Sequence, residues 1–147
     1  MKFEHRFRVR ASQESVARFH ASAGSLRAIT PMPMTVQQAP PVLGSGSEIR
    51  FTLWMGPLPL RWHARVENVS LDGFDDVQIS GPFGAWHHRH NFIRLDDATT
   101  EVYDVVEAEL PRGLLRRALA LLMWAGMPLL FAYRGWRTRA LLQREAA

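Results

Sequence analysis

The sequence predicts an α+β protein: a curved antiparallel sheet of about seven strands wraps around a long C-terminal helix, with two short helices after the first strand. Residues 2–110 contain seven strand-like segments, and the short turns between most of them favour antiparallel pairing. Residues 111–143 are dominated by good helix formers, and Ala118 to Tyr133 carries no charge. Because a helix that is apolar all round is buried or contacts something other than water, we expect the sheet to cover it.

Size and composition restrict the class of protein. A chain of 147 residues suits one domain with a sizeable core. The absence of cysteine excludes a disulfide scaffold, a thiolate metal site and a cysteine nucleophile. The first residues lack the apolar run of a signal peptide, which predicts a cytoplasmic location. The net charge is +4, but the basic residues are spread along the chain, so nucleic acid is not an expected partner.

The N-terminal part predicts one strand followed by two short helices. Residues 2–10 alternate between apolar and charged side chains, as in a strand with one face in water. Ser12 is a suitable N-cap for a helix over residues 13–20. A second short helix is expected over residues 26–29, and Pro31 ends it.

Six further strands are expected before the last helix. Their segments alternate in hydrophobicity and are bounded by glycine, proline or aspartate turns. They cover residues 34–39, 48–55, 60–70, 74–80, 84–95 and 99–110. Pro111 suits the first turn of the final helix, and Pro128, close to Gly126, predicts a kink near its middle.

Four motifs resemble one known group of proteins. The stretch from Gly81 to Phe92, GPFGAWHHRHNF, is similar to a G-P-F-x-x-W-x-H-x-H-x-F strand found in small bacterial members of the SRPBCC superfamily. A V-x-D-x-V strand follows at Val102–Val106, then Leu110-Pro111 opens the last helix, and Phe131–Arg134 resembles a late-helix signature. The superfamily comprises the START-like, polyketide-cyclase-like and pollen-allergen-like helix-grip proteins.

This resemblance implies that the sheet grips the C-terminal helix and that a hydrophobic cavity lies between them. Members of the superfamily bind lipids, polyketides, hormones or other apolar molecules, and some cyclise or hydrolyse them. We therefore expect an apolar small molecule as the partner of this chain, and no cofactor.

Strand geometry identifies a buried polar pair. A hairpin that turns at residues 96–98 pairs Leu95 with Thr99, and counting back places His90 opposite Asp104 and His88 opposite Val106. His90 and Asp104 then lie inside the fold. They are either a satisfied structural pair, an anchor for a ligand, or the acid–base pair of an enzyme assisted by His88.

The predicted ligand site combines this pair with apolar side chains from neighbouring strands and from the last helix. Aromatic and methionine side chains at such positions more often form a core than a cavity, although methionine suits adaptable surfaces. The expected site residues are Phe51, Leu53, Trp62, Ala64, Trp86, His88, His90, Asp104, Met127, Leu130 and Phe131.

A metal site is a weaker hypothesis. His88 and His90 share one strand face, and His5 is the best third ligand, since His63 should point away if Trp62 points inwards. Two secure ligands are too few, so no metal is expected.

Three functions remain open: a carrier or sensor of an apolar molecule, a cyclase- or hydrolase-type enzyme, and an interaction module. The last depends on the apolar helix. Its 16 uncharged residues fall short of the roughly 20 that cross a bilayer. A core helix is the default, with peripheral membrane contact or a homodimer through Trp124 and Trp136 as alternatives.

Overall fold

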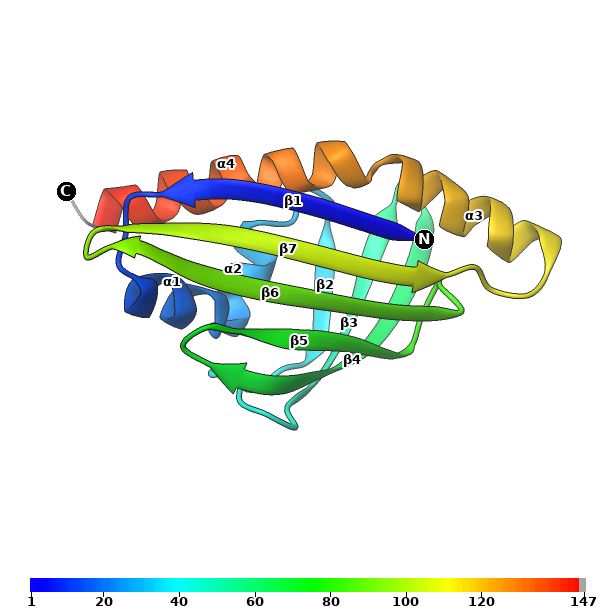
Figure 1. Cartoon of the computed structure of the whole chain (residues 1–147). Coiled ribbons are helices and arrows are strands. Elements are labelled where there is room, and N and C mark those ends of the chain that lie inside the picture. Colours follow the sequence, from blue (N-terminus) through cyan, green and yellow to red (C-terminus); the bar gives the residue numbers. More distant parts are fainter. Residues whose placement is uncertain (146–147) are drawn as a thin grey trace.

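Seven strands form one antiparallel sheet in the computed structural model, which describes residues 1–145 (Figure 1). The order across the sheet is β1-β7-β6-β5-β4-β3-β2, so each strand lies beside its neighbour in sequence except that β1 pairs with β7. The strands are β1 (Lys2–Val9), β2 (Met34–Gln38), β3 (Glu48–Met55), β4 (Leu58–Ser70), β5 (Gly73–Ser80), β6 (Ala85–Asp96) and β7 (Thr99–Glu109).

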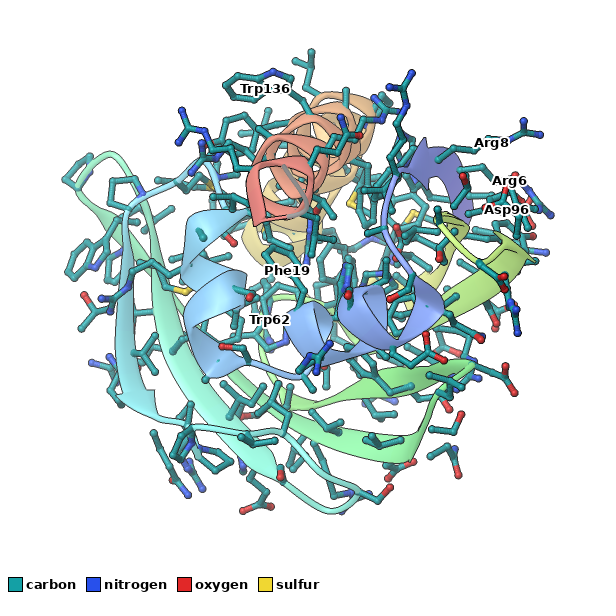
Figure 2. All side chains as sticks on the ribbon, turned by 90° about the vertical axis from the view of Figure 1, so that its left-hand side faces the viewer. Arg6, Arg8, Phe19, Trp62, Asp96 and Trp136 are labelled. Atoms are coloured by element: carbon teal, nitrogen blue, oxygen red, sulfur yellow. The ribbon has the colours of Figure 1, made fainter. Side chains whose placement is uncertain are left out.

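The helices lie on the concave side of this sheet. They are α1 (Gln13–His20), α2 (Ala23–Ala28), α3 (Leu114–Ala125) and α4 (Met127–Glu145). Figure 1 shows α4 running alongside β1, and Figure 2 shows the sheet curving around an interior that α4 closes on one side. Phe19 and Trp62 point into this interior, whereas Arg6 and Arg8 lie on the outer face of β1 (Figure 2). The predicted α+β helix-grip architecture is confirmed.

Most element boundaries agree with the sequence prediction, and the differences have local causes. The hydroxyl of Ser12 accepts a hydrogen bond from the Ser15 amide at 3.2 Å, so α1 starts where predicted. The second helix starts earlier than predicted, at Ala23, and β4 starts at Leu58 because the turn before it needs only residues 56 and 57.

The long C-terminal helix was predicted as one element, and this is wrong. Pro111 lies outside any helix, and Gly113, at φ 91°, precedes the start of α3. The amide of Gly126 closes α3 on the carbonyls of Leu122 and Met123 at 3.3 and 3.1 Å. Because Pro128 has no N–H, the helix cannot continue unbroken, and α4 runs at 44° to α3. The predicted kink is therefore a complete break.

The predicted register of the β6–β7 hairpin is confirmed along most of its length. His90 pairs with Asp104 and His88 with Val106. The exception is at the turn, where Asp96 rather than Leu95 pairs with Thr99, so that Leu95 is left over in a bulge.

The interior contains two clusters of buried apolar side chains. The first, which we call the α1-end core, lies beneath α1 and the β6–β7 turn and includes Val9, Val16, Phe92 and Val102. The second, which we call the α3-end cluster, lies beneath the α3–α4 break and includes Leu53, Trp62, Trp86, Met127 and Phe131.

Candidate functional site: a cavity beneath the helix break

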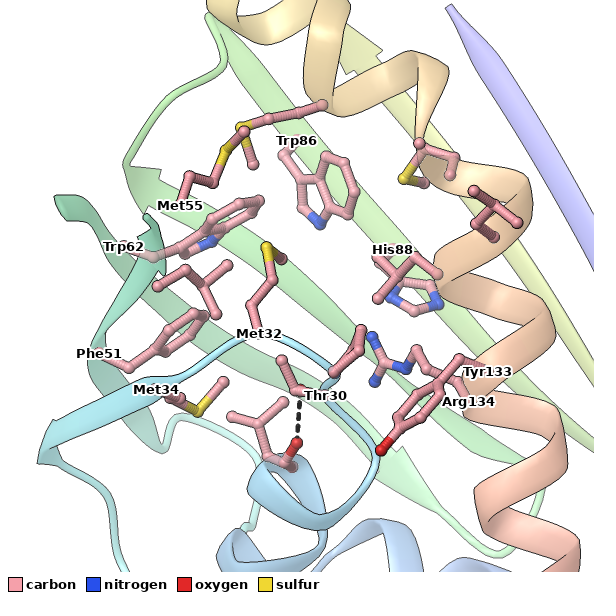
Figure 3. A pocket seen from close by; sticks show the side chains of 18 of the residues that line it. Thr30, Met32, Met34, Phe51, Met55, Trp62, Trp86, His88, Tyr133 and Arg134 are labelled. Atoms are coloured by element: carbon pink, nitrogen blue, oxygen red, sulfur yellow. Dashed lines mark hydrogen bonds between the residues drawn. The ribbon is translucent and has the colours of Figure 1, made fainter. Parts of the chain in front are cut away.

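A cavity of about 490 Å³ lies within the α3-end cluster, between the sheet and the α3–α4 break. Its walls come from strands β2 to β6, both terminal helices, α2 and the loop that follows α2 (Figure 3). The apolar lining includes Met32, Met34, Phe51, Leu53, Met55, Trp62, Phe83, Trp86, Met123, Met127 and Leu130. Its size is within the range of small-molecule pockets.

Seven of the eleven predicted site residues line this cavity. They are Phe51, Leu53, Trp62, Trp86, His88, Met127 and Leu130. The other four are buried beside it: Ala64, His90, Asp104 and Phe131. His90 instead borders a second, much smaller space of about 40 Å³ together with His20.

Two rows of paired residues place the polar side chains across the sheet. The first row joins Phe74, His90, Asp104 and His5 on β5, β6, β7 and β1. The adjacent row includes Asp76 on β5, paired with His88 on β6. We call Asp76, His88, His90 and Asp104 the polar belt. Along β6 the belt lies between Trp86 of the α3-end cluster and Phe92 of the α1-end core.

The hydrogen bonding within the belt differs from the predicted pair. The imidazole Nε2 of His88 lies 2.8 Å from Oδ1 of Asp104 and is hydrogen-bonded to it. His90 is directly opposite Asp104, but its Nδ1, at 3.2 Å, lacks hydrogen-bond geometry and has no partner among residues 1–145. The His90 ring instead stacks on Phe74, with 4.1 Å between ring centroids. The Asp104 carboxylate is therefore hydrogen-bonded to His88, its diagonal neighbour, and not to His90, which lies directly opposite.

Burial keeps the belt histidines neutral. It lowers the pKa of His90 to about 4, and the pKa of His20, on α1 beside it, also to about 4. It lowers the pKa of His88 as well, although Asp104 acts in the opposite direction. Burial alone raises the pKa of Asp104, but the hydrogen bond from His88 and the nearby His90 outweigh it and hold that pKa well below its usual range.

Two ionisable residues of the cavity were missed by the sequence prediction. Asp76 comes from β5, and its Oδ1 is buried without a hydrogen-bond partner among residues 1–145. Arg134 comes from α4, and Figure 3 shows its guanidinium pointing into the pocket. Burial raises the pKa of Asp76 and lowers the pKa of Arg134. Both positions carry a sequence signal: Asp76 alternates with the inward Phe74, and Arg134 follows Phe131 by about one helical turn.

The belt also contains a set of side chains that could hold a metal ion. One ligand atom from each of Asp76, His88 and His90 lies within 4.8 Å of the others. His88 would ligate through Nδ1, because its Nε2 is engaged by Asp104. Neither earlier third-ligand candidate belongs to this set: His5 packs on Phe131, and His63 lies near Glu48 on the outer face. The positive charge of Arg134 opposes a cation here.

The outer side of the terminal helices carries exposed apolar side chains. Leu115 and Leu129 are 84% and 80% exposed, and Trp136 points outwards (Figure 2). Trp124, however, packs against Phe3 and Phe83, so the surface suggested for a homodimer lacks one of its two tryptophans. Within residues 1–145, no single helix is long and apolar enough to cross a membrane. Only α3 and α4 taken together, as a bent pair, meet the criteria of length and composition.

Known proteins share the fold of this chain at low sequence identity. No protein-family model matches the sequence, and no curated protein matches it. The aromatase/cyclase Zhui from Streptomyces sp. R1128 superposes with a TM-score of 0.81 at 13% identity, covering 100% of this chain and 96% of the other.

Two further structures extend the comparison. Norcoclaurine synthase from Thalictrum flavum, solved with dopamine and hydroxybenzaldehyde, has a TM-score of 0.71 at 13% identity, covering 98% of this chain and 87% of that one. A START superfamily protein from Mycobacterium smegmatis has a TM-score of 0.68 at 13% identity, with 97% of each chain covered. The chain therefore has the helix-grip fold of START superfamily proteins and aromatase/cyclases.

Proposed function

We propose that this protein binds a hydrophobic small molecule in the cavity beneath the α3–α4 break, as a carrier or a sensor. The observation that carries the proposal is the cavity itself. About 490 Å³ is left open among side chains that would otherwise pack together, and the lining is aromatic and methionine-rich with a few polar groups. Such a lining is typical of small-molecule sites.

The lining also favours an adaptable site. Five of the six methionines of the chain border the cavity, and their unbranched side chains can fit ligands of different shape. The comparisons support this proposal, since structures with the same fold include a START superfamily protein and a synthase that holds two small aromatic molecules.

The direct test is native mass spectrometry of the protein purified from its own host, beside the same sample denatured. We expect a bound apolar molecule that is released on denaturation. A cavity-filling variant, Met55→Trp, should lose it, whereas Arg61→Trp, at an exposed position on the outer face of the same hairpin, should retain it. A protein that is empty in every preparation and binds no added apolar compound contradicts the proposal.

A second candidate, an enzyme of cyclase or hydrolase type, is favoured by one observation. His88 borders the cavity while its Nε2 is held by the buried Asp104, which is how an acid–base histidine is oriented. In that case the identified ligand would be converted by the native protein. A His88→Gln variant would bind the ligand without converting it.

A further inference from the structure

We propose that the ligand carries one anionic oxygen group, such as a carboxylate, and that Arg134 on α4 binds it. This inference rests on the proposed function and specifies the chemical class of the ligand. The observation behind it is a guanidinium that enters the cavity and forms no ion pair within 4.0 Å among residues 1–145, although Asp76 and Asp104 lie near enough to act on its charge (Figure 3).

The polar contacts of Arg134 are incomplete. Among residues 1–145, no carboxylate oxygen lies within 4.0 Å of its nitrogens, and only burial and the charges of Asp104 and Asp76 act on it, with no hydrogen bond. Its one cation contact is the ring face of Phe131, 5.4 Å from the guanidinium carbon. A charge that is partly removed from water needs a partner, and two other arginines of α4 have one: Arg137 and Arg139 donate to backbone carbonyls.

The acidic residues nearest to Arg134 do not serve as that partner. Asp104 is already engaged by His88 at 2.8 Å. Asp76 lines the same cavity, and its Oδ1 has no hydrogen-bond partner among residues 1–145. Burial raises the pKa of Asp76, which favours its protonated form, and a protonated carboxyl can donate a hydrogen bond. An oxyanion placed between the two would accept from Arg134 and from Asp76.

The remainder of the lining limits the ligand to one such group. Beyond the polar end, the walls are mainly aromatic rings and thioethers: Phe51, Trp62, Phe83, Trp86, Met32 and Met55. Tyr133 also lines the cavity and adds one hydroxyl, but within the described part of the chain Arg134 is its one basic side chain besides the neutral His88. The hydroxyl of Thr30 is not free, because it donates to the Leu26 carbonyl at 2.6 Å. The expected ligand is therefore an apolar molecule with a single anionic group at one end. A guanidinium suits a carboxylate in particular, because two N–H groups can bind its two oxygens.

Paired probes test the inference. Calorimetric titration compares 2-naphthoate with 2-naphthamide at pH 7, since the two share shape and apolar surface and differ in charge. We expect the wild-type protein to bind the carboxylate at least about tenfold more tightly than the amide. Arg134→Met should reduce this preference to less than about threefold while the amide still binds. Arg144→Met, which changes an exposed arginine of the same helix, should leave the preference unchanged.

The outcomes separate this inference from the proposed function. If the wild-type protein binds both probes equally, the anionic head is wrong and the hydrophobic site stands. If it binds neither, nor any other apolar compound, the proposed function fails together with the inference. If Arg134→Met keeps the preference for the carboxylate, another group binds the anion and the assignment of Arg134 is overturned. The wild-type comparison decides the ligand class even if the variant does not fold.

Discussion

The α1-end core and the α3-end cluster lie under the same sheet and against the same C-terminal chain, yet only one of them is filled. At the α1 end, α1 packs onto β6 and β7, and Val9, Phe92 and Val102 are at most 2% exposed. At the α3 end none of the residues that line the cavity comes from α1, and about 490 Å³ stays open. The polar belt lies between them.

The difference between the two ends is one of side-chain type as well as of topology. The α1-end core is dominated by valine and phenylalanine, which have few rotamers and pack tightly. The cavity is bordered by tryptophans and methionines, which are large or flexible enough to remain apart around an open space. The comparison suggests that the first end provides stability and the second provides binding.

The largest expected contrast comes from removing one phenylalanine inside the α1-end core and one that borders the cavity and packs against both clusters. Phe92→Ala should lower the free energy of unfolding by about 3–5 kcal/mol, because a 2% exposed ring leaves a cavity that cannot collapse. Phe51→Ala should cost no more than about 2 kcal/mol, since this half-buried ring already borders an open space. Urea unfolding measures both values, and equal costs would contradict the division into two ends.

The polar belt can be tested by comparing two histidines that make the same contact on opposite faces of β6. His88 bonds to Asp104 and His87 to Asp75, each at 2.8 Å, but their side chains are 3% and 49% exposed. His88→Ala should cost about 2–4 kcal/mol, because it leaves a buried carboxylate without its donor. His87→Ala should cost less than about 1 kcal/mol. Similar losses for both variants would show that the belt is no more important than a surface pair.

Acidification should weaken the protein through the neutral buried histidines. The pKa values of His20 and His90 fall to about 4 from an ordinary 6.5, so between these pH values the unfolded chain binds protons that the native state does not. The free energy of unfolding should therefore decrease, by a few kcal/mol in total, as pH falls from 6.5 towards 4.

Other groups facing these histidines act differently. Asp104, with its lowered pKa, contributes stability that is lost only at more acidic pH. Asp76, whose pKa is raised, opposes the trend, and Arg134 keeps its charge throughout. The test is the pH dependence of urea unfolding in two variants. His20→Asn should flatten it, whereas the control His63→Asn, which alters a histidine near Glu48 on the outer face, should not. A wild-type slope retained in His20→Asn would contradict the assignment.

The smallest effects are expected on the outer side of the terminal helices. Leu115→Gln replaces a leucine that is 84% exposed and does not border the cavity, so stability should change by less than about 0.5 kcal/mol and ligand affinity not at all. Leu129→Gln, also exposed but at the cavity rim, should weaken binding slightly. Calorimetry with 2-naphthoate distinguishes the two. An equal loss in both variants would favour a role for the whole helix surface.

Sequence reasoning recovered the parts of the fold that depend on local periodicity. The alternation in β6 and β7 fixed their register, because a slip by one residue would have turned Phe92 and Val102 away from the core. The start of α1 followed from a single N-cap serine. The path of the C-terminal chain was predicted less well. A kink near Gly126 was expected, but the sequence did not predict that it divides the segment into two helices.

The candidate site was predictable only in part. Its aromatic and methionine walls follow from strand faces, whereas the choice of hydrogen-bond partner within the belt does not. Asp104 faces His90 across the strands but bonds to His88, a difference of side-chain rotamer that periodicity cannot resolve. Asp76 and Arg134 carried weak signals, since charged residues at inward positions are easily assigned to solvent.

The central claim, that the cavity takes an apolar ligand, is tested most directly by NMR of the methionine methyl groups during titration with 2-naphthamide and 2-naphthoate. Met32, Met34, Met55, Met123 and Met127 line the cavity, and Met1 does not. We expect the methyl signals of these five residues to shift in a saturable manner, while the chemical shift of the Met1 methyl group does not change. Six unchanged signals, or a response at Met1 as large as that of the other five, would contradict it.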